Sequence, residues 1–517
     1  MKYRLGIDVG GTNTDAVILT PKDRVVAKTK TPVTRDVVSS IRDAVRTVLR
    51  DSELQPDAIS HAMLGTTQIT NAIIERQRLN QVGMIRVGAP ATLAVPPLTG
   101  WPTELKVVVD RASITVRGGH EFDGRPMGSL AMDDVRRFLD DNANQVSSVA
   151  VTAVFSPVNA EHEFAIRDLI MQKYPHLSVS LSHEIGSVGL LERENATVLN
   201  AAVSEVARLA ATAFESALQE VGIDAALFFA QNDGTLMAMD YALRYPILTV
   251  ACGPTNSMRG AAFLSQVNDA VIIDVGGTSS DIGMIRGGFP RQSSLAVEVG
   301  GVRTNFRMPD LIALGLGGGS RVREDESKLT VGPDSVGYRI IQEAQVFGGD
   351  VLTLTDVAVN EGKARIGNQA PRVPRQLSER AYREALRLIE DGIDRIKTSA
   401  EAVPLIAVGG GSALLPDHLE GVSRVIRPEH FDVANAIGAA IAQVSGRVDR
   451  IYAMNGRSRD QVIQDAILTA KADAVRAGAN HDTIEVIEVE EIPLAYLPSN
   501  ASRVRVTVAG QLAGDGQ

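Results

Sequence analysis

The chain has 517 residues, 44% apolar and 22% charged, a globular composition in a length that exceeds what one hydrophobic core usually supports. The net charge of −10 argues against a nucleic-acid surface, and no uncharged apolar run approaches the ~18 residues that a membrane span needs. The lone Cys252 excludes an internal disulfide, and Asp8 interrupts the first apolar run too early for a signal peptide. We therefore expect a cytoplasmic protein, and its length predicts at least two domains.

The first expected element is a hairpin with a glycine-rich turn. The apolar residues 5–7 precede Asp-Val-Gly-Gly-Thr-Asn-Thr-Asp at residues 8–15, and the apolar residues 16–19 follow. Strand, glycine turn and strand together indicate a β-hairpin. Next, Asp36 precedes apolar residues at helical spacing up to Leu49, so we expect a helix there with Asp36 as its N-cap.

The later elements follow the same hydrophobic patterns. We expect helical segments over residues 192–221, 434–444 and 461–477, a buried strand over 404–408, and strands over 483–487 and 503–508. In the helix over 434–444, Gly438 would allow another backbone to approach closely.

The hairpin turn recurs in the second half of the chain. Residues 274–281 read Asp-Val-Gly-Gly-Thr-Ser-Ser-Asp, again between two apolar runs, and differ from the first copy only where Asn13 and Thr14 are replaced by serine. The separation is too long for a repeat array, so the copies indicate a duplicated domain. We therefore predict an N-terminal domain over 1–190, a second domain over 191–448, and a small α+β segment over 449–517.

These turns suit a nucleotide triphosphate bound with Mg²⁺. Their glycines bring backbone N–H groups close to phosphate oxygens, and their hydroxyl groups add further donors. The phosphate-binding residues expected from this argument are Gly10, Gly11, Thr12, Asn13, Thr14, Gly276, Gly277, Thr278 and Ser279. Asp8 and Asp274, at the strand ends, cannot face phosphate without a cation, so we expect both to be catalytic residues that hold Mg²⁺. Asp15 and Asp281 could support them or serve as structural caps.

A third glycine run follows the buried strand over 404–408. Gly409, Gly410 and Gly411 could let the backbone pass against the adenosine part of ATP. A P-loop nucleotide site is excluded, because no Gly-x-x-x-x-Gly-Lys-Ser/Thr sequence is present. A Rossmann turn is also disfavoured, because the first glycine loop leads into a strand rather than a helix.

Two glycine loops followed by an adenosine glycine run resemble the actin-like ATPases, which implies duplicated α/β domains with an RNase H-like fold around a nucleotide cleft. More narrowly, the chain resembles the hydantoinase/oxoprolinase family, A-subunit type, over residues 3–450. The resemblance rests on residues 65–76 (Gly-Thr-Thr-Gln-Ile-Thr-Asn-Ala-Ile-Ile-Glu-Arg), 191–201, 253–261 and 315–320. The histidine that many longer members carry before Gly-Thr-Thr is replaced here by Leu64.

The family resemblance implies that ATP phosphorylates the amide oxygen of a lactam or hydantoin, so that water can open the ring. It implies Thr66, Thr67 and Asn71 as substrate contacts, and Asp310 is a plausible polar residue of the same cleft. It also implies a separate B-type subunit for the hydrolytic step, and a homo-oligomer is compatible with it. An ATP-dependent ketone carboxylase subunit, a regulatory or chaperone-like ATPase, and a small-molecule kinase are the alternatives.

Overall fold

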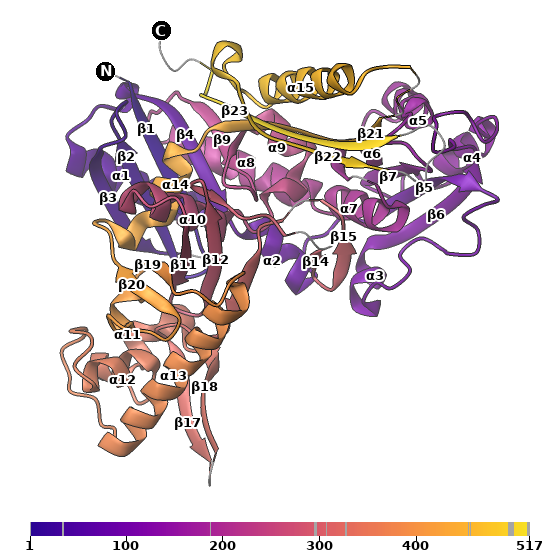
Figure 1. Ribbon diagram of the computed structural model, residues 1–517. Coiled ribbons are helices and arrows are strands. Elements are labelled where there is room, and N and C mark those ends of the chain that lie inside the picture. The colour runs from indigo at the N-terminus through magenta and orange to yellow at the C-terminus, as the bar shows by residue number, and fades with distance from the viewer. Residues whose placement is uncertain are drawn as a thin grey trace.

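The computed structural model describes residues 2–513 except 34–35, 187, 294–296, 307, 326–327, 453, 455 and 495–500. Its frame consists of two large mixed sheets, one above the other in Figure 1, with helices α10 and α14 between them. Among the described residues, no helix is both long enough and apolar enough to cross a lipid bilayer.

The first sheet has nine strands in the order β22-β23-β21-β10-β9-β4-β1-β2-β3. In chain order they are β1 (Tyr3–Val9), β2 (Asn13–Leu19), β3 (Val25–Pro32), β4 (Ile59–Thr66), β9 (Ala226–Ala230), β10 (Leu236–Ala238), β21 (Val444–Tyr452), β22 (Glu485–Pro493) and β23 (Ser502–Gly510). The expected hairpin is present as β1 and β2. The helix predicted after Asp36 is α1 (Val37–Ser52), and the Asp36 side chain accepts hydrogen bonds from the amides of Val38 and Ser39.

The second sheet repeats the central arrangement of the first. Its strands are β11 (Ala270–Val275), β12 (Ser280–Arg286), β13 (Phe289–Pro290), β16 (Leu311–Leu314), β19 (Val403–Val408) and β20 (Val422–Ile426). The order β13-β12-β11-β19-β20 matches β3-β2-β1-β4-β9, with an antiparallel pair at the hairpin and parallel pairs after it in both cases. The duplication expected from the repeated turns is therefore a duplication of sheet topology.

A four-stranded parallel sheet lies within the N-terminal half, in the order β6-β5-β7-β8. It consists of β5 (Val82–Ala89), β6 (Asp110–Arg117), β7 (Ser148–Ala153) and β8 (Ser178–Leu181), with helices α3 (Thr103–Val109), α4 (Met132–Asn142), α5 (Glu161–Lys173) and α6 (Ser182–Ile185). Its two central strands, β5 and β7, are buried along almost their whole length, as expected inside a parallel sheet that is covered on both faces, whereas the edge strand β6 is largely half-buried or exposed.

The remaining elements connect and cover the sheets. The helices are α2 (Gln68–Glu75), α7 (Leu190–Ala202), α8 (Ser204–Gln219), α9 (Met239–Arg244), α10 (Cys252–Ser265), α11 (Ile340–Glu343), α12 (Leu354–Asn360), α13 (Arg375–Ile396), α14 (Ala434–Ile441) and α15 (Arg459–Arg476). Two small hairpins are formed by β14 (Val297–Val299) with β15 (Val302–Thr304), and by β17 (Ser320–Asp325) with β18 (Lys328–Ser335). The segment expected to be helical over 192–221 is thus two helices, α7 and α8.

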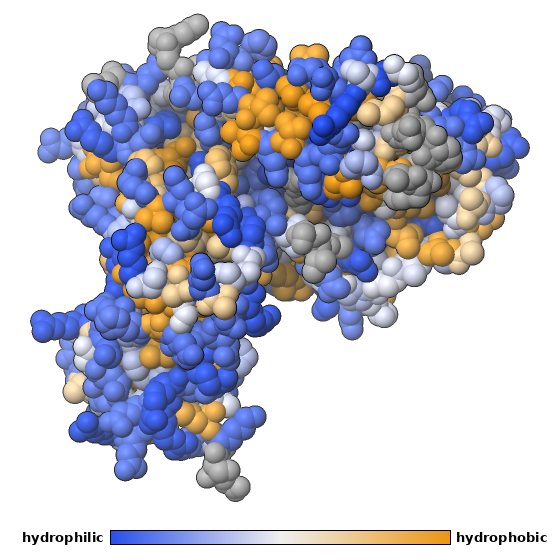
Figure 2. All heavy atoms as spheres, in the orientation of Figure 1, coloured by the Kyte–Doolittle hydropathy of each residue, from blue (hydrophilic) through white to orange (hydrophobic). Residues whose placement is uncertain are grey.

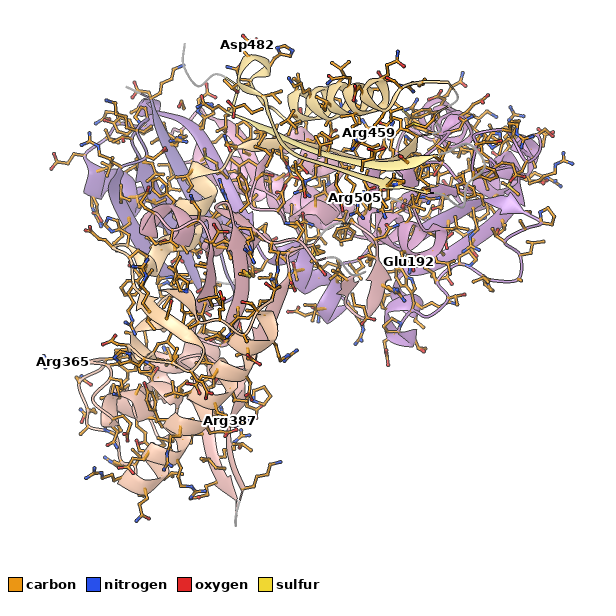
Figure 3. The ribbon with its side chains drawn as sticks, viewed as in Figure 1. Glu192, Arg365, Arg387, Arg459, Asp482 and Arg505 are labelled. Atoms are coloured by element: carbon orange, nitrogen blue, oxygen red, sulfur yellow. The ribbon has the colours of Figure 1, made fainter. Side chains whose placement is uncertain are left out.

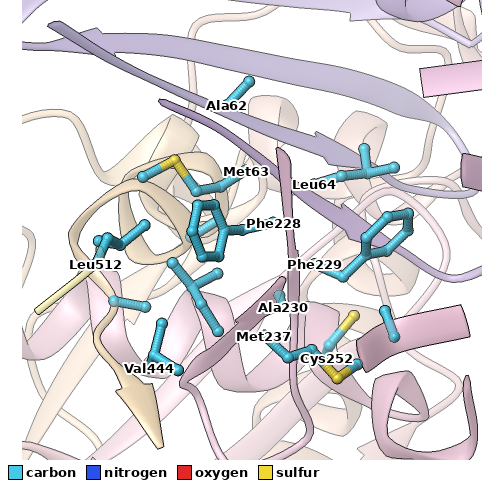
Figure 4. Close-up of a cluster of buried hydrophobic side chains, with 14 of the residues drawn as sticks. Ala62, Met63, Leu64, Phe228, Phe229, Ala230, Met237, Cys252, Val444 and Leu512 are labelled. Carbon is cyan, nitrogen blue, oxygen red and sulfur yellow. The ribbon is translucent and has the colours of Figure 1, made fainter. Parts of the chain in front are cut away.

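The sheets do not follow the domain division expected from the sequence. Strands β9 and β10, after residue 190, and β21 to β23, near the C-terminus, all pair into the first sheet. Figure 4 shows Phe228 and Phe229 of β9, Met237 of β10 and Val444 of β21 beside Met63 of β4 in one buried cluster. The α+β character predicted for the C-terminal segment is present, but its strands β22 and β23 continue the first sheet, and β23 contributes Val504, Val506 and Val508 to that core.

Candidate active site

A cavity of about 640 Å³ lies where the two sheets face each other. Its lining includes the turns of both repeated hairpins and the third glycine run. From the first turn come Asp8, Gly10, Gly11, Thr12, Asn13 and Asp15; from the second come Asp274, Gly276, Gly277, Thr278, Ser279 and Asp281; and from the third come Gly409, Gly410 and Gly411. Residues far apart in the chain are therefore gathered around one space.

The two hairpin turns have the same internal geometry. Asp8 lies opposite Asp15 in the β1–β2 register, and Asp274 lies opposite Asp281 in the β11–β12 register. The Gly10 amide donates to the Asn13 carbonyl over 3.0 Å, and the Gly276 amide donates to the Ser279 carbonyl over 2.9 Å. The repeated sequence thus specifies a repeated local structure.

Each turn leaves its middle backbone amides available. Within the described residues, no acceptor is found for the N–H groups of Gly11 and Thr12, or of Gly277 and Thr278. The turns lie close together, since a Cβ atom added to Gly277 would come within 3.7 Å of the Thr12 hydroxyl oxygen. Two pairs of unpaired amides at one cavity form an anion-binding arrangement suited to phosphate oxygens.

The carboxylates of the first turn are held by side chains from other elements. Asn435, in α14, donates from its amide nitrogen to Asp8 over 3.0 Å and to Asp15 over 2.8 Å. Lys30, opposite Asp15 in the β2–β3 register, donates to the Asp15 carboxylate over 2.6 Å. Asn256, in α10, makes a longer bond of 3.4 Å to Asp8. The position of Asp8 therefore depends on both helices between the sheets.

Asp274 in the second turn has a partner in α10 as well. The Ser257 hydroxyl donates to Asp274. Behind the carboxylate, Gly409 adopts a positive φ of +83°, and a Cβ atom there would lie 2.1 Å from Asp274 Oδ1. A side chain at residue 409 is thus excluded both by backbone conformation and by contact with Asp274.

Burial raises the pKa values of the four aspartates in the two turns. Loss of solvent, with repulsion from Asp15 as the next cause, raises the pKa of Asp8 to about 6. Burial, followed by repulsion from Asp274, raises the pKa of Asp281 to about 7. Burial also raises the pKa of Asp15 and of Asp274, although hydrogen bonds from Lys30 and Ser257 oppose that shift. The site therefore contains more buried negative charge than its own residues compensate.

A hard divalent cation is the natural counterion for such a site. In the part of the chain that the structure describes, no three carboxylate, imidazole or thiolate groups converge as a complete metal cage. Mg²⁺, however, is usually held by one or two carboxylates together with water and substrate phosphates. One aspartate from each turn, beside unpaired amides, fits that mode of binding.

The raised pKa values predict how stability depends on pH without metal. Because Asp8 and Asp281 bind protons more tightly in the folded than in the unfolded chain, their contribution to stability is complete only below their ordinary pKa of 3.8. It is lost as the pH rises through about 6 to 7. In EDTA, we expect the Tm difference between wild type and the Asp8→Asn/Asp281→Asn variant to widen from pH 5 to pH 8, with wild type less stable.

Scanning calorimetry at matched ionic strength measures this difference. Mg²⁺ should restore the wild-type Tm at pH 8 and have little effect at pH 5, where protons occupy the carboxylates. Parallel pH profiles for the two proteins would contradict the prediction, and the Asp310→Asn variant, altered outside the cavity, serves as the control.

Not all residues predicted for the site line the cavity. Thr67 and Asn71 do, beside the first turn. Thr14 is fully buried within β2, outside the cavity lining. Thr66 is also buried, and its hydroxyl oxygen accepts from the Gln68 amide at the start of α2. Asp310 forms an ion pair with Arg291 away from the cavity. The side chains of Thr66 and Asp310 are thus bonded elsewhere, and the buried Thr14 hydroxyl has no hydrogen-bond partner among the described residues.

The sequence analysis did not predict the four residues whose side chains bond to the aspartates of the two turns, Lys30, Asn256, Ser257 and Asn435. Lys30 could have been found by extending the hairpin register to the third strand. Asn256 and Ser257 lie just after Gly253-Pro254, within the segment 253–261 that carries the family resemblance. Asn435 lies in the first turn of the small-residue helix predicted over 434–444. It is a polar residue among small apolar ones, and this could have indicated a role in the site.

Comparison with family models gives two matches that are consecutive along the chain. Residues 4–174 match the hydantoinase/oxoprolinase N-terminal region, and residues 193–366 match hydantoinase/oxoprolinase. Together these models cover most of the chain and include both repeated turns.

Two curated relatives are subunits of larger enzymes. The alpha subunit of caprolactamase from Pseudomonas jessenii is 25% identical over 69% of this chain and 54% of its own length. The gamma subunit of acetophenone carboxylase from Aromatoleum aromaticum is 26% identical over 86% of this chain and 64% of its own length. The match thus spans less than two thirds of either relative.

A solved structure shares the fold over nearly the whole chain. The crystal structure of ATP-dependent caprolactamase from Pseudomonas jessenii superposes with a TM-score of 0.77 at 21% identity, covering 99% of this chain and 88% of that one. This likeness and the duplicated sheet order confirm the predicted α/β actin-like ATPase fold.

Proposed function

Because this chain belongs to the hydantoinase/oxoprolinase family, we propose that it is the ATP-using subunit of a cyclic amidohydrolase. In this proposal, ATP phosphorylates the amide oxygen of a lactam or hydantoin. The observation that carries it is the convergence of both Asp-Val-Gly-Gly-Thr turns on one cavity of about 640 Å³.

The proposed nucleotide site uses the groups that the fold leaves unpaired. The amides of Gly11, Thr12, Gly277 and Thr278 would bind phosphate oxygens from two sides. Asn13, Ser279 and the threonine hydroxyl groups would add donors, and Gly409 to Gly411 would lie beside the adenosine. Asp8 and Asp274 would hold Mg²⁺, which would neutralise phosphate charge that the aspartates alone would repel.

Bound ATP would supply a phosphoryl group to the amide oxygen, which would remove the amide resonance and turn that oxygen into a better leaving group. The part of this chain is positioning and charge compensation, as in other phosphoryl-transfer proteins. The positive charge of Lys30 offsets the negative charge of Asp15, and the Asn435 amide fixes the positions of the Asp8 and Asp15 carboxylates by donating to both. Thr67 and Asn71 would contact the amide, since they line the cavity beside the first turn.

A second polypeptide is part of the proposal. The relatives are named as alpha and gamma subunits, which supports a multi-subunit enzyme. We expect a B-type subunit to open the activated ring.

A ketone carboxylase subunit is the second candidate. The match to the acetophenone carboxylase gamma subunit extends over 86% of this chain, against 69% for the caprolactamase subunit. Both reactions can begin with phosphorylation of a carbonyl or enolate oxygen, so the same cavity would serve either one.

ADP release with panels of lactams, hydantoins and ketones separates these functions. Each compound is incubated with the chain, ATP and Mg²⁺, with and without bicarbonate and with and without a B-type subunit. We expect a lactam or hydantoin to stimulate ADP release several-fold without bicarbonate.

Stimulation only by a ketone with bicarbonate would replace the proposal by the carboxylase function. A stable phosphorylated product would indicate a kinase. ATP hydrolysis that no compound stimulates, with or without the second subunit, would favour a regulatory ATPase.

A further inference from the structure

A second cavity, larger than the nucleotide cavity formed by the two glycine turns, lies on the other side of helix α10. Its volume is about 920 Å³, and among the described residues none lines both cavities. Ser257 of α10 lines the nucleotide cavity. Arg259, on the opposite face of the same helix, places its guanidinium carbon 3.9 Å from the centre of the Phe289 ring, which lines the second cavity. Helix α10 therefore separates the two spaces.

One wall of the second cavity is a polar face of the nine-stranded sheet. Side chains alternate between the two faces of a strand, and Val504, Val506 and Val508 of β23 are buried together with alanines of α15. Arg505, labelled in Figure 3, lies on the side of the strands away from α15. The residues of β21 and β23 that line the cavity are Ser445, Arg447, Asp449, Arg503, Arg505, Thr507 and Ala509. The face opposite α15 thus turns its charged groups toward the cavity.

Other parts of the lining are apolar. Phe289 and Pro290 of β13 line the second cavity, as do Phe306 and, from β22, Val486 and Ile487. The two side chains of β22 are 43% and 46% exposed, so the cavity reaches the surface beside this strand. Figure 2 shows hydrophobic residues gathered over the C-terminal strands. A molecule that enters here passes apolar side chains and meets charged ones inside.

The charges of the polar face are of both signs and pair with one another. Arg503 donates to Asp449 through two hydrogen bonds of 2.7 Å. Arg505 donates to Asp449 over 3.2 Å and to Glu490 over 2.7 Å. Because cationic and anionic groups lie side by side, the lining suits a ligand that carries both charges better than a simple anion or cation.

Two buried polar atoms of this lining have no hydrogen-bond partner within the described part of the chain. Arg447 donates from Nη2 to the buried Asp233 carboxylate, but its Nε–H has no acceptor. Gln292 donates from Nε2 to the Pro290 carbonyl over 3.2 Å, but its Oε1 has no donor. Buried polar groups are rarely left unpaired, because the loss of hydration is then uncompensated. The two atoms require a bound molecule that offers an acceptor to Arg447 and a donor to Gln292.

We propose that the second cavity binds an amino acid, whose carboxylate accepts from Arg447 and whose ammonium group donates to Gln292. The hydrocarbon part of the ligand contacts Phe289 and Val486. Hydrolysis adds water across the ring C–N bond of a lactam and leaves a carboxylate and an ammonium group on one chain. This inference rests on the proposed function, and it makes the second cavity a site for the product, apart from the cavity in which the ring is activated.

Calorimetric titration of the full chain tests the proposal. Mg²⁺ and a non-hydrolysable ATP analogue are present at saturation, so that the nucleotide cavity is filled throughout. The probes are the straight-chain amino acids formed from lactams of five, six and seven ring atoms. We expect at least one of them to bind with one-to-one stoichiometry. The unsubstituted carboxylate and the unsubstituted amine of the same chain length should each bind at least tenfold more weakly, since each lacks one charged group.

Two substitutions remove the unpaired atoms one at a time. Arg447→Lys removes the Nε–H donor and keeps a positive charge beside Asp233, and Gln292→Leu removes the acceptor. Each should raise the Kd of the amino acid at least tenfold. Arg321→Lys is the matched control and should bind as wild type, because Arg321 is also half-buried and pairs with Glu343 over 3.1 Å outside both cavities. Circular dichroism and thermal unfolding establish that each variant folds.

Three results would overturn the proposal: no amino acid binds to the folded wild type, either variant binds as tightly as wild type, or the carboxylate alone binds as tightly as the amino acid. Because the titration involves no turnover, its failure is distinguishable from failure of the proposed function. A lactam can stimulate ADP release although no amino acid binds here. Conversely, amino acid binding without such stimulation would leave the second cavity a binding site and remove the amidohydrolase function.

Discussion

Replacing Asp8 by asparagine is expected to lower substrate-stimulated ATP turnover by a factor on the order of a hundred to a thousand, the range for removal of one electrostatic group from an active site. The substitution keeps the shape of the side chain and removes the charge proposed to hold Mg²⁺. Asn435 can still donate to the remaining side-chain oxygen, so the first turn should keep its position. Steady-state ADP release measures the loss, and calorimetry should show weaker Mg²⁺-ATP binding.

The same substitution should not destabilise the metal-free protein. Burial and the neighbouring Asp15 raise the pKa of Asp8 to about 6, so its charge is unfavourable at neutral pH. In EDTA at pH 7.5, the Tm of Asp8→Asn should equal or exceed that of wild type. Asp310→Asn should keep turnover within about twofold, because Asp310 pairs with Arg291 outside the nucleotide cavity. Normal turnover by Asp8→Asn would show that Asp8 does not hold Mg²⁺.

The largest effect on stability is expected at the crossing of α10 and α14. A Cβ atom at Gly438 of α14 would lie 1.8 Å from the Asn256 carbonyl oxygen, and one at Gly260 of α10 would lie 1.9 Å from the Ala434 carbonyl oxygen. Gly438→Ala should therefore lower the free energy of unfolding by about 3 kcal/mol or more, since the backbones must separate. Helix propensity alone predicts the opposite sign, a gain of about 1 kcal/mol.

Urea unfolding followed by circular dichroism measures this change. Gly438→Ala should also weaken Mg²⁺-ATP binding, because the displaced helices carry the asparagines that hold Asp8. The matched control is Gly128→Ala, where the nearest atom to an added Cβ is in the Arg117 side chain at 3.8 Å. Stability of Gly438→Ala at or above that of wild type would show that the two helices separate without strain.

Local features of the fold could be predicted because contiguous residues specify them. The hairpins follow from apolar runs on both sides of a glycine turn, and α1 begins where Asp36 caps it. Gly438 was expected to allow close approach, and the contact with Asn256 confirms it. The repeated turn also predicted the duplicated topology, because two copies of one hairpin fold in the same way.

The two acidic glycine turns, the duplicated topology and the family can be predicted from the order of the amino acids alone. Which distant residues complete the site, and which strands complete each sheet, depends on how the folded chain packs. Strand register places Lys30 beside Asp15, and the packing of α10 and α14 places Asn256 and Asn435 beside Asp8. Asp310, by contrast, forms an ion pair with Arg291 outside the nucleotide cavity. Turn and cap preferences depend on neighbours in the chain, but the partner of a side chain or a strand depends on which apolar surfaces are buried together.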